Sequence, residues 1–392
     1  MLRGKITFWR MVLAVLLILG VYATILRFAR GLGASTNLSD AFPWGLWIGF
    51  DVMCGVMLAA GGFTLTAAVY IFNLKTLKPI LRPTVLTAFL GYALVTVALI
   101  FDLGRGYRIW HPLVMWNPRS VMFEVAWCVT LYTTVLALEF SGVIFERLKF
   151  SKLIRLQHAI VVPLVIAGVM LSTLHQSSLG SLYLIVPNKL HPYWYTPLLP
   201  VLFFLSAICV GIAMTIFESS MSARHFGKQL EIPLLQALGR TLLVVLAVYT
   251  VVRFEDLAHR HVLHLIAKGG YETELFLLEM LLCSVAPIVL LLIPRVRASA
   301  NGLYVASVLC LLGFVTNRMN VAITGMEASA GQHYFPKWTE TAVTFAIVGF
   351  GFLVFALAVK YLPIFAQAEE SQSIARAGVG EDGVPELLDV SP

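Results

Sequence analysis

Ten long apolar stretches run through this chain, and they restrict its fold more than any other feature. They cover residues 9–29, 44–72, 83–103, 120–145, 155–174, 197–217, 232–252, 273–293, 299–317 and 339–361. About 20 consecutive apolar residues suffice for a helix to cross a bilayer, where a helix satisfies its own backbone hydrogen bonds. The sequence therefore predicts an all-α, polytopic integral membrane protein, with about ten transmembrane helices arranged as a bundle.

The composition agrees with a membrane protein. Hydrophobic residues make up 59% of the 392 residues, and charged residues make up only 12%, against roughly 25% in soluble domains. The net charge is +7, but the basic residues lie in short loops between apolar runs. Membrane topology explains such loops better than nucleic-acid binding does. We therefore expect membrane lipid as a partner and no nucleic acid.

Lysine and arginine are divided unequally between the two sides of the predicted bundle. An even number of spans places both termini on one side, and 17 of the 28 Lys and Arg residues lie there. The positive-inside rule then places both termini in the cytoplasm. We expect residues 1–365 to form the transmembrane domain. Residues 366–392 are acidic and without periodicity, which predicts a disordered cytoplasmic tail.

The outer loops differ from the inner ones in length and composition. The loops at 101–120, 174–195 and 253–274 are long and contain aromatic, histidine and charged residues. Loops of this kind often bind, dock a partner or form a lid. Their aromatic side chains would also suit the interfacial aromatic belt of a membrane protein; these are Trp110, Trp116, Trp194 and Tyr195.

The fourth apolar stretch carries two carboxylates, Glu124 and Glu139. Their spacing of 15 residues separates them by roughly 22 Å along a helix and by about 60° around its axis. A carboxylate inside a membrane is costly and indicates function. Two on one helix face, one near each leaflet, indicate a route for protons. Alternatively, buried Arg or Ser partners satisfy both groups.

Other polar side chains also fall within or beside the predicted spans. They are Asp51, Asp102, His158, His175, Glu218, Arg240, Glu279 and Arg318. The predicted order from the outer face is His175 and Asp102, then Glu124, then Tyr92 and Tyr132, then Glu139 and Glu218. Such a set could relay protons with water between the groups, or consist of unrelated, satisfied polar residues.

Cysteine and histidine positions argue against metal cofactors in this chain. The five cysteines lie singly in apolar segments without a CxxC motif, so we expect neither an iron–sulfur cluster nor another metal site. Haem held by two histidines needs them at one depth on facing helices. Only His158 and His175 lie within the predicted spans, on one helix. We therefore expect no haem.

Several motifs identify a family resemblance over residues 31–363. They are FPWGLWIGFDV (42–52), FDLGRGYRIW (101–110), SVMFEVAWC (120–128), LALEFSGVIFERL (136–148), LHQSSLGSLY (174–183), IFESS (216–220) and VVRFEDL (251–257). Together they resemble the NrfD and polysulfide-reductase membrane-subunit family. Within it, LHQSSLGSL and SVMFEVAWC most closely resemble the hydrogenase-2 branch, the HybB-type subunits. These subunits are usually described as cytochrome b, but the histidine positions in this sequence do not support haem.

The resemblance implies a quinone-reactive membrane anchor in the bacterial cytoplasmic membrane. Such an anchor exchanges electrons between menaquinone or ubiquinone and an extracytoplasmic, ferredoxin-like iron–sulfur subunit. That subunit would serve the large and small subunits of a nickel–iron hydrogenase, so this chain would hold no catalytic residues for hydrogen itself. By matching motifs, His175 would bind a quinone carbonyl. Asp102 and Arg105 would shape the quinone pocket.

Proton movement through the subunit is also implied by the resemblance. The corresponding positions are Tyr92, Glu124, Glu139, His175 and Glu218. Two alternatives stay open. The same anchor could serve a polysulfide, tetrathionate or other molybdenum reductase. A proton-coupled secondary transporter would instead predict an internal repeat with broken helices at matching positions, and no such repeat is evident.

Overall fold

The computed structural model describes residues 8–226 and 232–365. Within these residues the chain is helical and contains no β-strand. Ten segments are long and apolar enough to cross a membrane, which confirms the predicted fold class. They are Phe8–Arg30, Trp47–Ile71, Lys75–Asp102, Val121–Leu148, Ser151–Leu184, Leu199–His225, Ile232–His259, Tyr271–Leu292, Ala300–Ala330 and Trp338–Tyr361. The predicted disordered tail at 366–392 lies outside the described residues.

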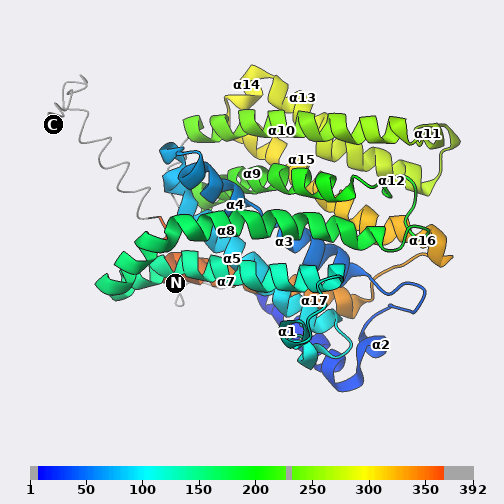
Figure 1. Cartoon of the computed structure of the whole chain (residues 1–392), viewed down its shortest axis with the longest axis horizontal. Coiled ribbons are helices and arrows are strands. Elements are labelled where there is room, and N and C mark those ends of the chain that lie inside the picture. Colours follow the sequence, from blue (N-terminus) through cyan, green and yellow to red (C-terminus); the bar gives the residue numbers. More distant parts are fainter. Residues whose placement is uncertain (1–7, 227–231, 366–392) are drawn as a thin grey trace.

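Four consecutive long helices form one layer of the bundle. They are α7 (Val121–Leu148), α8 (Ser151–Leu184), α9 (Leu199–Phe226) and α10 (Ile232–His259). Each packs against the next, and the chain reverses direction between them (Figure 1). Each of these helices crosses the bundle once, so successive helices run antiparallel (Figure 1).

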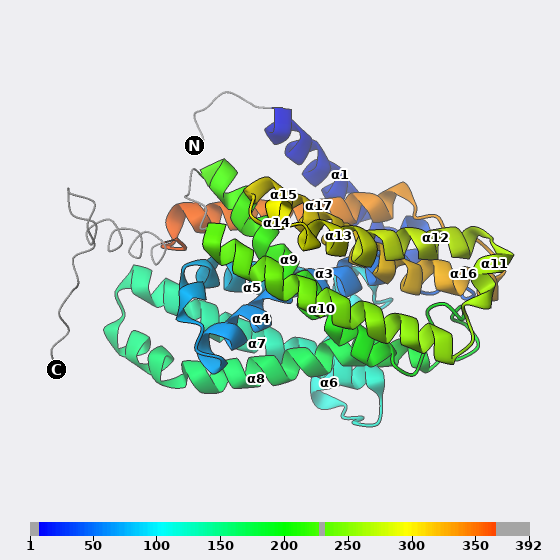
Figure 2. The same cartoon turned by 90° about the horizontal axis from the view of Figure 1, so that it is seen from above.

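The remaining helices cover this layer. Helix α5 (Lys78–Asp102) packs against α7 and against α17 (Trp338–Tyr361), and α15 (Ala300–Met319) packs against α9 and α10. Helix α1 (Phe8–Arg30) rests on α17 at the edge of the molecule (Figure 2). Most of its side chains face outward, as expected for a helix in contact with lipid.

Three spans contain stretches of π-helix. The second span begins with η1 (Trp47–Cys54), continues through α3 (Gly55–Leu58) and α4 (Gly61–Thr66), and ends with η2 (Ala67–Ile71). The eighth contains η5 (Leu281–Val285) between α12 (Tyr271–Met280) and α13 (Ala286–Leu292), and the ninth contains η6 (Asn320–Thr324). Such segments often occur at functional sites, and here η1, η5 and η6 carry buried Asp51, Ser284 and Asn320.

Glycine permits close helix packing in the second span. A Cβ atom at Gly61 would lie 3.0 Å from Thr84 Cγ2 and 3.2 Å from the Gly211 carbonyl oxygen. Helices α4, α5 and α9 therefore approach closely only because these positions lack side chains.

Helix α8 is longer than the sequence predicts. The apolar run ends near residue 174, but α8 continues to Leu184, so the predicted boundary is wrong. The polar residues beyond it belong to a buried helix face, since His175, Gln176 and Ser178 are all buried. His175 therefore lies within a membrane-spanning helix rather than at its outer end.

The described chain begins and ends at one end of the bundle (Figure 1). An even number of spans requires this arrangement. The same end carries the basic side chains that predict a cytoplasmic location, and we call it the basic end. The other end, with the connections around α11 (His264–Lys268) and α16 (Gly325–Ala330), is called the opposite end.

Candidate functional site

His175 and Tyr92 form the centre of the candidate site. His175 of α8 and Tyr92 of α5 are both fully buried. The Tyr92 hydroxyl and His175 Nδ1 are joined by a hydrogen bond of 3.0 Å. The Tyr92 ring also packs edge-to-face against Tyr132 of α7, with 4.7 Å between ring centroids. Three helices that the sequence could not place together thus meet at this pair.

Several polar atoms around this pair have no hydrogen-bond partner among the described residues. They are Tyr132 Oη, Ser172 Oγ, His175 Nε2 and Gln176 Oε1. Buried polar atoms normally pair with protein, ordered water or a ligand. This cluster therefore offers hydrogen-bonding capacity to a small polar ligand.

Glu124 lies on the side of His175 that faces the opposite end. Its Oε1 accepts a hydrogen bond of 2.5 Å from Ser178 Oγ, and Ser178 lies one turn beyond His175 on α8. The predicted order, with His175 outside Glu124, is therefore wrong. Glu124 also stands in the first turn of α7 and is exposed. A helix N-terminus favours a carboxylate there, so Glu124 is a less costly group than the apolar run predicts.

Glu139 lies further along α7 toward the basic end. A Cβ atom at Gly168 of α8 would lie 3.6 Å from Glu139 Oε1 and 3.5 Å from Tyr132 Cε2. The side chains of Glu139 and Tyr132 thus both lie close to Gly168. The structure brings Glu124, Tyr132 and Glu139 of α7, His175 of α8 and Tyr92 of α5 into a row. Among the described side chains, only the Glu124–Ser178 and Tyr92–His175 links in this row are hydrogen bonds.

Glu218 stands apart from this row. It is buried on α9, and neither carboxylate oxygen has a hydrogen-bond partner within the described residues. No hydrogen bond or ion pair of the described side chains joins Glu218 to Glu139 or His175. Helix α9 packs against α8 and α4, which places Glu218 inside the bundle.

Asp102 and Arg105 do not join His175. Asp102 ends α5 and lies ten residues after Tyr92, or roughly 15 Å along the helix. Its Oδ1 is buried without a partner, and Arg105 is exposed on the following loop. The predicted grouping of these three residues in one pocket is therefore not seen.

Arg27, rather than Arg105, is the buried arginine beside Asp102. Its side chain donates hydrogen bonds of 2.7 Å to the Phe101 carbonyl and 2.9 Å to the Leu103 carbonyl. The Arg27 guanidinium also attracts the Asp102 carboxylate. The sequence contained one signal that could have identified Arg27, namely an arginine inside the first apolar run.

A second polar cluster lies between α10, α12, α15 and η6. Glu279 is fully buried; its Oε1 accepts from Asn317, and its Oε2 accepts from Trp194 and Asn320, each at 2.8 Å. Arg253 approaches Glu279 Oε1 to 3.9 Å. The carboxylate therefore has a complete set of donors. The sequence marks Glu279 as a buried acid, but its pattern did not single out Arg253 or either asparagine.

Arg318 belongs to the same cluster. Its guanidinium donates to Asn317 at 2.6 Å and to Ser206 at 2.7 Å, and stacks over the Phe203 ring at 3.6 Å. Asp51, another predicted buried acid, accepts a hydrogen bond of 2.7 Å from Thr344. These groups resemble fixed structural partners more than mobile proton carriers.

The tryptophans divide between the surface and this cluster. Trp194 is fully buried and bonded to Glu279, so its expected place in an interfacial belt is wrong. Trp110 and Trp116 are 50% and 66% exposed on the loop that contains α6 (His111–Val114), which protrudes in Figure 2. Their position suits the interfacial belt.

Side chains that could ligate a metal are dispersed through the described part of the chain. Within residues 8–226 and 232–365, no group of three or more His, Cys, Asp or Glu side chains could hold a metal ion. The five cysteines are free and buried. His175 Nδ1 is bonded to Tyr92, Nε2 has no hydrogen-bond partner within the described residues, and no second histidine among them bonds to that ring.

Comparison with known proteins gives consistent matches over almost the whole chain. A family model described as polysulphide reductase, NrfD, matches residues 34–330. A protein of Nitratidesulfovibrio vulgaris is 38% identical over 372 residues, covering 92% of this chain and 95% of the relative.

Two further relatives have functional names. A probable Ni/Fe-hydrogenase 2 b-type cytochrome subunit of Escherichia coli is 32% identical over 367 residues, covering 92% of this chain and 93% of the relative. The integral membrane subunit of a menaquinone reductase from N. vulgaris is 30% identical over 398 residues, covering 94% of each chain.

Proposed function

Because the chain belongs to the NrfD polysulphide-reductase family of membrane subunits, we propose that it is the quinone-reactive subunit of a respiratory nickel–iron hydrogenase. It passes electrons between an extracytoplasmic, ferredoxin-like iron–sulfur subunit and menaquinone or ubiquinone in the bacterial cytoplasmic membrane. The relatives named for hydrogenase 2 and for menaquinone reductase support this partner and this substrate.

The Tyr92–His175 hydrogen bond is the observation that carries the proposal. Reduction of a quinone to a quinol consumes protons together with electrons, so a proton-exchanging group must stand at the carbonyl oxygen. In the tautomer in which Nδ1 accepts from the Tyr92 hydroxyl, His175 carries its proton on Nε2, the atom without a hydrogen-bond partner among the described residues. Nε2–H can then donate to a quinone carbonyl, while Tyr92 holds the ring in this tautomer.

Protons would reach His175 along the row on α7 and α8. Glu139 lies toward the basic end, and Tyr132 and Ser172 lie between it and the Tyr92–His175 pair, with water bridging the unpaired atoms. Glu124 and Ser178 would continue the route toward the opposite end. Glu218 would serve as a separate proton reservoir within the bundle, since it is buried and its carboxylate oxygens have no hydrogen-bond partner within the described residues.

Asp102 and Arg105 retain a narrower role in this proposal. Both lie at the opposite end, where the iron–sulfur subunit would dock. We expect them to affect docking or quinone entry rather than to touch the carbonyl bound at His175.

Substitution of His175 by alanine tests the proposal in membranes that contain the whole complex. We expect hydrogen-dependent quinone reduction to fall roughly a hundredfold or more, the usual contribution of a positioned proton donor. Tyr92→Phe should cause a smaller loss, because it removes the hydroxyl that orients the ring.

Two controls separate this role from simple misassembly. Hydrogen oxidation with a soluble dye, which takes electrons before the membrane subunit, should be unchanged in His175→Ala. His225→Ala, which alters an exposed histidine at the end of α9, should reduce quinone normally. Wild-type quinone reduction in His175→Ala would contradict the site.

A second partner is also supported by a named relative. The match to the menaquinone reductase subunit favours the same anchor in another reductase complex. Purification of the native complex distinguishes the two, because a nickel–iron large subunit or a different catalytic subunit would accompany this chain.

A further inference from the structure

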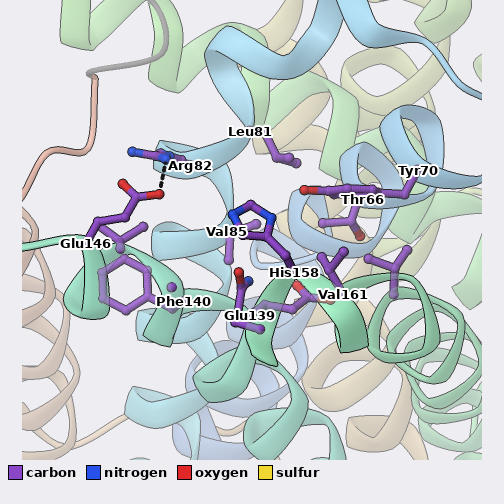
Figure 3. Close-up of a pocket in the computed structure, with 14 residues that line it drawn as sticks. Thr66, Tyr70, Leu81, Arg82, Val85, Glu139, Phe140, Glu146, His158 and Val161 are labelled. Atoms are coloured by element: carbon purple, nitrogen blue, oxygen red, sulfur yellow. Dashed lines mark hydrogen bonds and ion pairs between the residues drawn. The ribbon is translucent and has the colours of Figure 1, made fainter. Parts of the chain in front are cut away.

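A cavity large enough to hold water opens beside Glu139 near the basic end of the bundle. Its volume is about 90 Å³, and roughly 10–15 Å³ of such space holds one water molecule. Its walls come from the end of α4 and from η2, α5, α7 and α8 (Figure 3). It therefore has room for several water molecules at the end of the row that leads to His175.

Two carboxylates line this cavity, and only one is neutralised. Glu146 accepts a hydrogen bond of 2.7 Å from Arg82, whose guanidinium also donates to the Pro363 carbonyl at 3.2 Å. Glu139 has no hydrogen bond or ion pair with any described residue, so its carboxylate is free to exchange a proton with the cavity.

His158 also lies on the cavity wall, with its imidazole ring among the lining groups. It projects from α8, two turns inside the helix start at Ser151, and has no hydrogen bond or ion pair within the described residues. Figure 3 shows His158 and Glu139 on adjoining walls, with the Arg82–Glu146 pair on one side and Tyr70 on the other.

We propose that His158 loads protons into this cavity and delivers them to Glu139. This inference rests on the proposed function, to which it adds the entry point. Water from the adjoining aqueous phase protonates the imidazole. The N–H bond of the imidazolium then breaks as an O–H bond forms on Glu139, directly or through one cavity water, and neutral His158 is regenerated.

Arg82 and Glu146 form an ion pair on the cavity wall, so their charges largely offset each other. Glu139 and His158 are the lining acid and imidazole that stand outside any ion pair within the described residues, and a proton can pass between them.

Chemical rescue of a His158→Ala variant tests the proposal. The whole complex is reconstituted in proteoliposomes, and charge movement per electron is measured during hydrogen-dependent quinone reduction. We expect His158→Ala to lower charge movement about tenfold or more, within the range of lost general acid–base groups. Imidazole added to the medium on the basic side should restore most of it, because it fits the vacated space.

Two outcomes would overturn the assignment of His158. Charge movement at the wild-type level in His158→Ala would show that the residue is dispensable. A loss that imidazole does not restore would assign His158 a structural role. His225→Ala, which alters an exposed histidine at the same end, serves as the control. Its charge movement should equal that of the wild type, with or without added imidazole.

The test also separates this inference from the proposed function. Quinone reduction with a protonophore present reports electron transfer alone. It should continue in His158→Ala, with the quinone protons drawn from the opposite end through Glu124 and Ser178. If the wild-type complex reduces quinone without moving charge, the proton row itself fails. If it moves charge and His158→Ala does so equally, only the entry point fails.

Discussion

Glu139 and Glu279 are both acidic side chains inside membrane-spanning helices, but their surroundings differ. Glu279 accepts hydrogen bonds from Trp194, Asn317 and Asn320 and faces two buried arginines. Glu139 borders a cavity and has no such partner among the described residues. A carboxylate held by several donors keeps its charge, whereas an unpaired one next to water can gain and lose a proton.

Glutamine substitutions should separate these two roles. Glu279→Gln leaves the positive charges of Arg253 and Arg318 buried without compensation, so we expect a loss of about 3–5 kcal/mol in stability. Glu139→Gln should change stability by less than about 0.5 kcal/mol but should abolish charge movement. Thermal unfolding of the solubilised complex and proteoliposome assays measure the two effects.

The reverse pattern would contradict this assignment. A stable Glu279→Gln complex that no longer moves charge would make Glu279 the proton carrier. At the residue scale the sequence identified both Glu139 and Glu279 as acidic side chains within predicted spans. It did not predict which of them was paired, because the donors to Glu279 come from an outer loop and another helix, up to 85 residues away.

The segment that joins α8 to α9, residues 185–198, shows how one connection is held on the bundle. The His191 amide donates a hydrogen bond of 2.7 Å to the Gly325 carbonyl, and Trp194 anchors the loop to Glu279. The Tyr193 amide donates to His191 Nδ1 at 3.2 Å, so that nitrogen carries no proton. Burial lowers the pKa of His191 below 6.5, although Glu272 partly opposes the shift.

Acidification should therefore loosen this loop. Because the pKa of His191 is lower in the folded loop, the opened loop binds more protons. The loop is fully stable above pH 6.5 and loses stability as the pH falls below that value. After correction for the intrinsic exchange rate, which itself falls with pH, the protection of the Tyr193 and Trp194 amides against hydrogen exchange should decrease from about pH 7 to pH 5. His191→Asn should remove most of this pH dependence, whereas an equal decrease in both proteins would rule out His191 as the cause.

Element boundaries were only partly predictable from the apolar pattern. The number and order of the spans followed from it, because each span must cover the bilayer with its own residues. The extension of α8 did not, since its polar residues look like a loop in sequence but pack into a buried face. Polar patterning signals exposure only when the neighbouring elements are known.

The whole molecule has one end rich in basic residues, where the described chain begins and ends. The positive-inside rule predicts that this end faces the cytoplasm. The five native cysteines are buried, so single cysteines introduced at exposed sites can report the orientation with little background.

Cysteine labelling should give opposite results at the two ends. A membrane-impermeant maleimide should label Lys152→Cys in inside-out vesicles and Tyr107→Cys in intact spheroplasts, since both side chains are exposed. The opposite pattern would invert the topology and move the proposed proton entry to the other face. The unsubstituted protein, which has only its buried cysteines, serves as the control for background labelling in each preparation.

The sequence by itself determined the membrane class, the ten spans and the family, because the free energy of burying a helix in lipid depends on contiguous residues. It also marked Glu124 and Glu139 as unusual. Only the tertiary structure decided that Glu124 lies at a helix start beside Ser178, that His175 meets Tyr92, and that Glu139 opens onto a cavity with His158. These pairings depend on which helices pack together, and that choice is made by side-chain and glycine contacts between segments far apart in the chain.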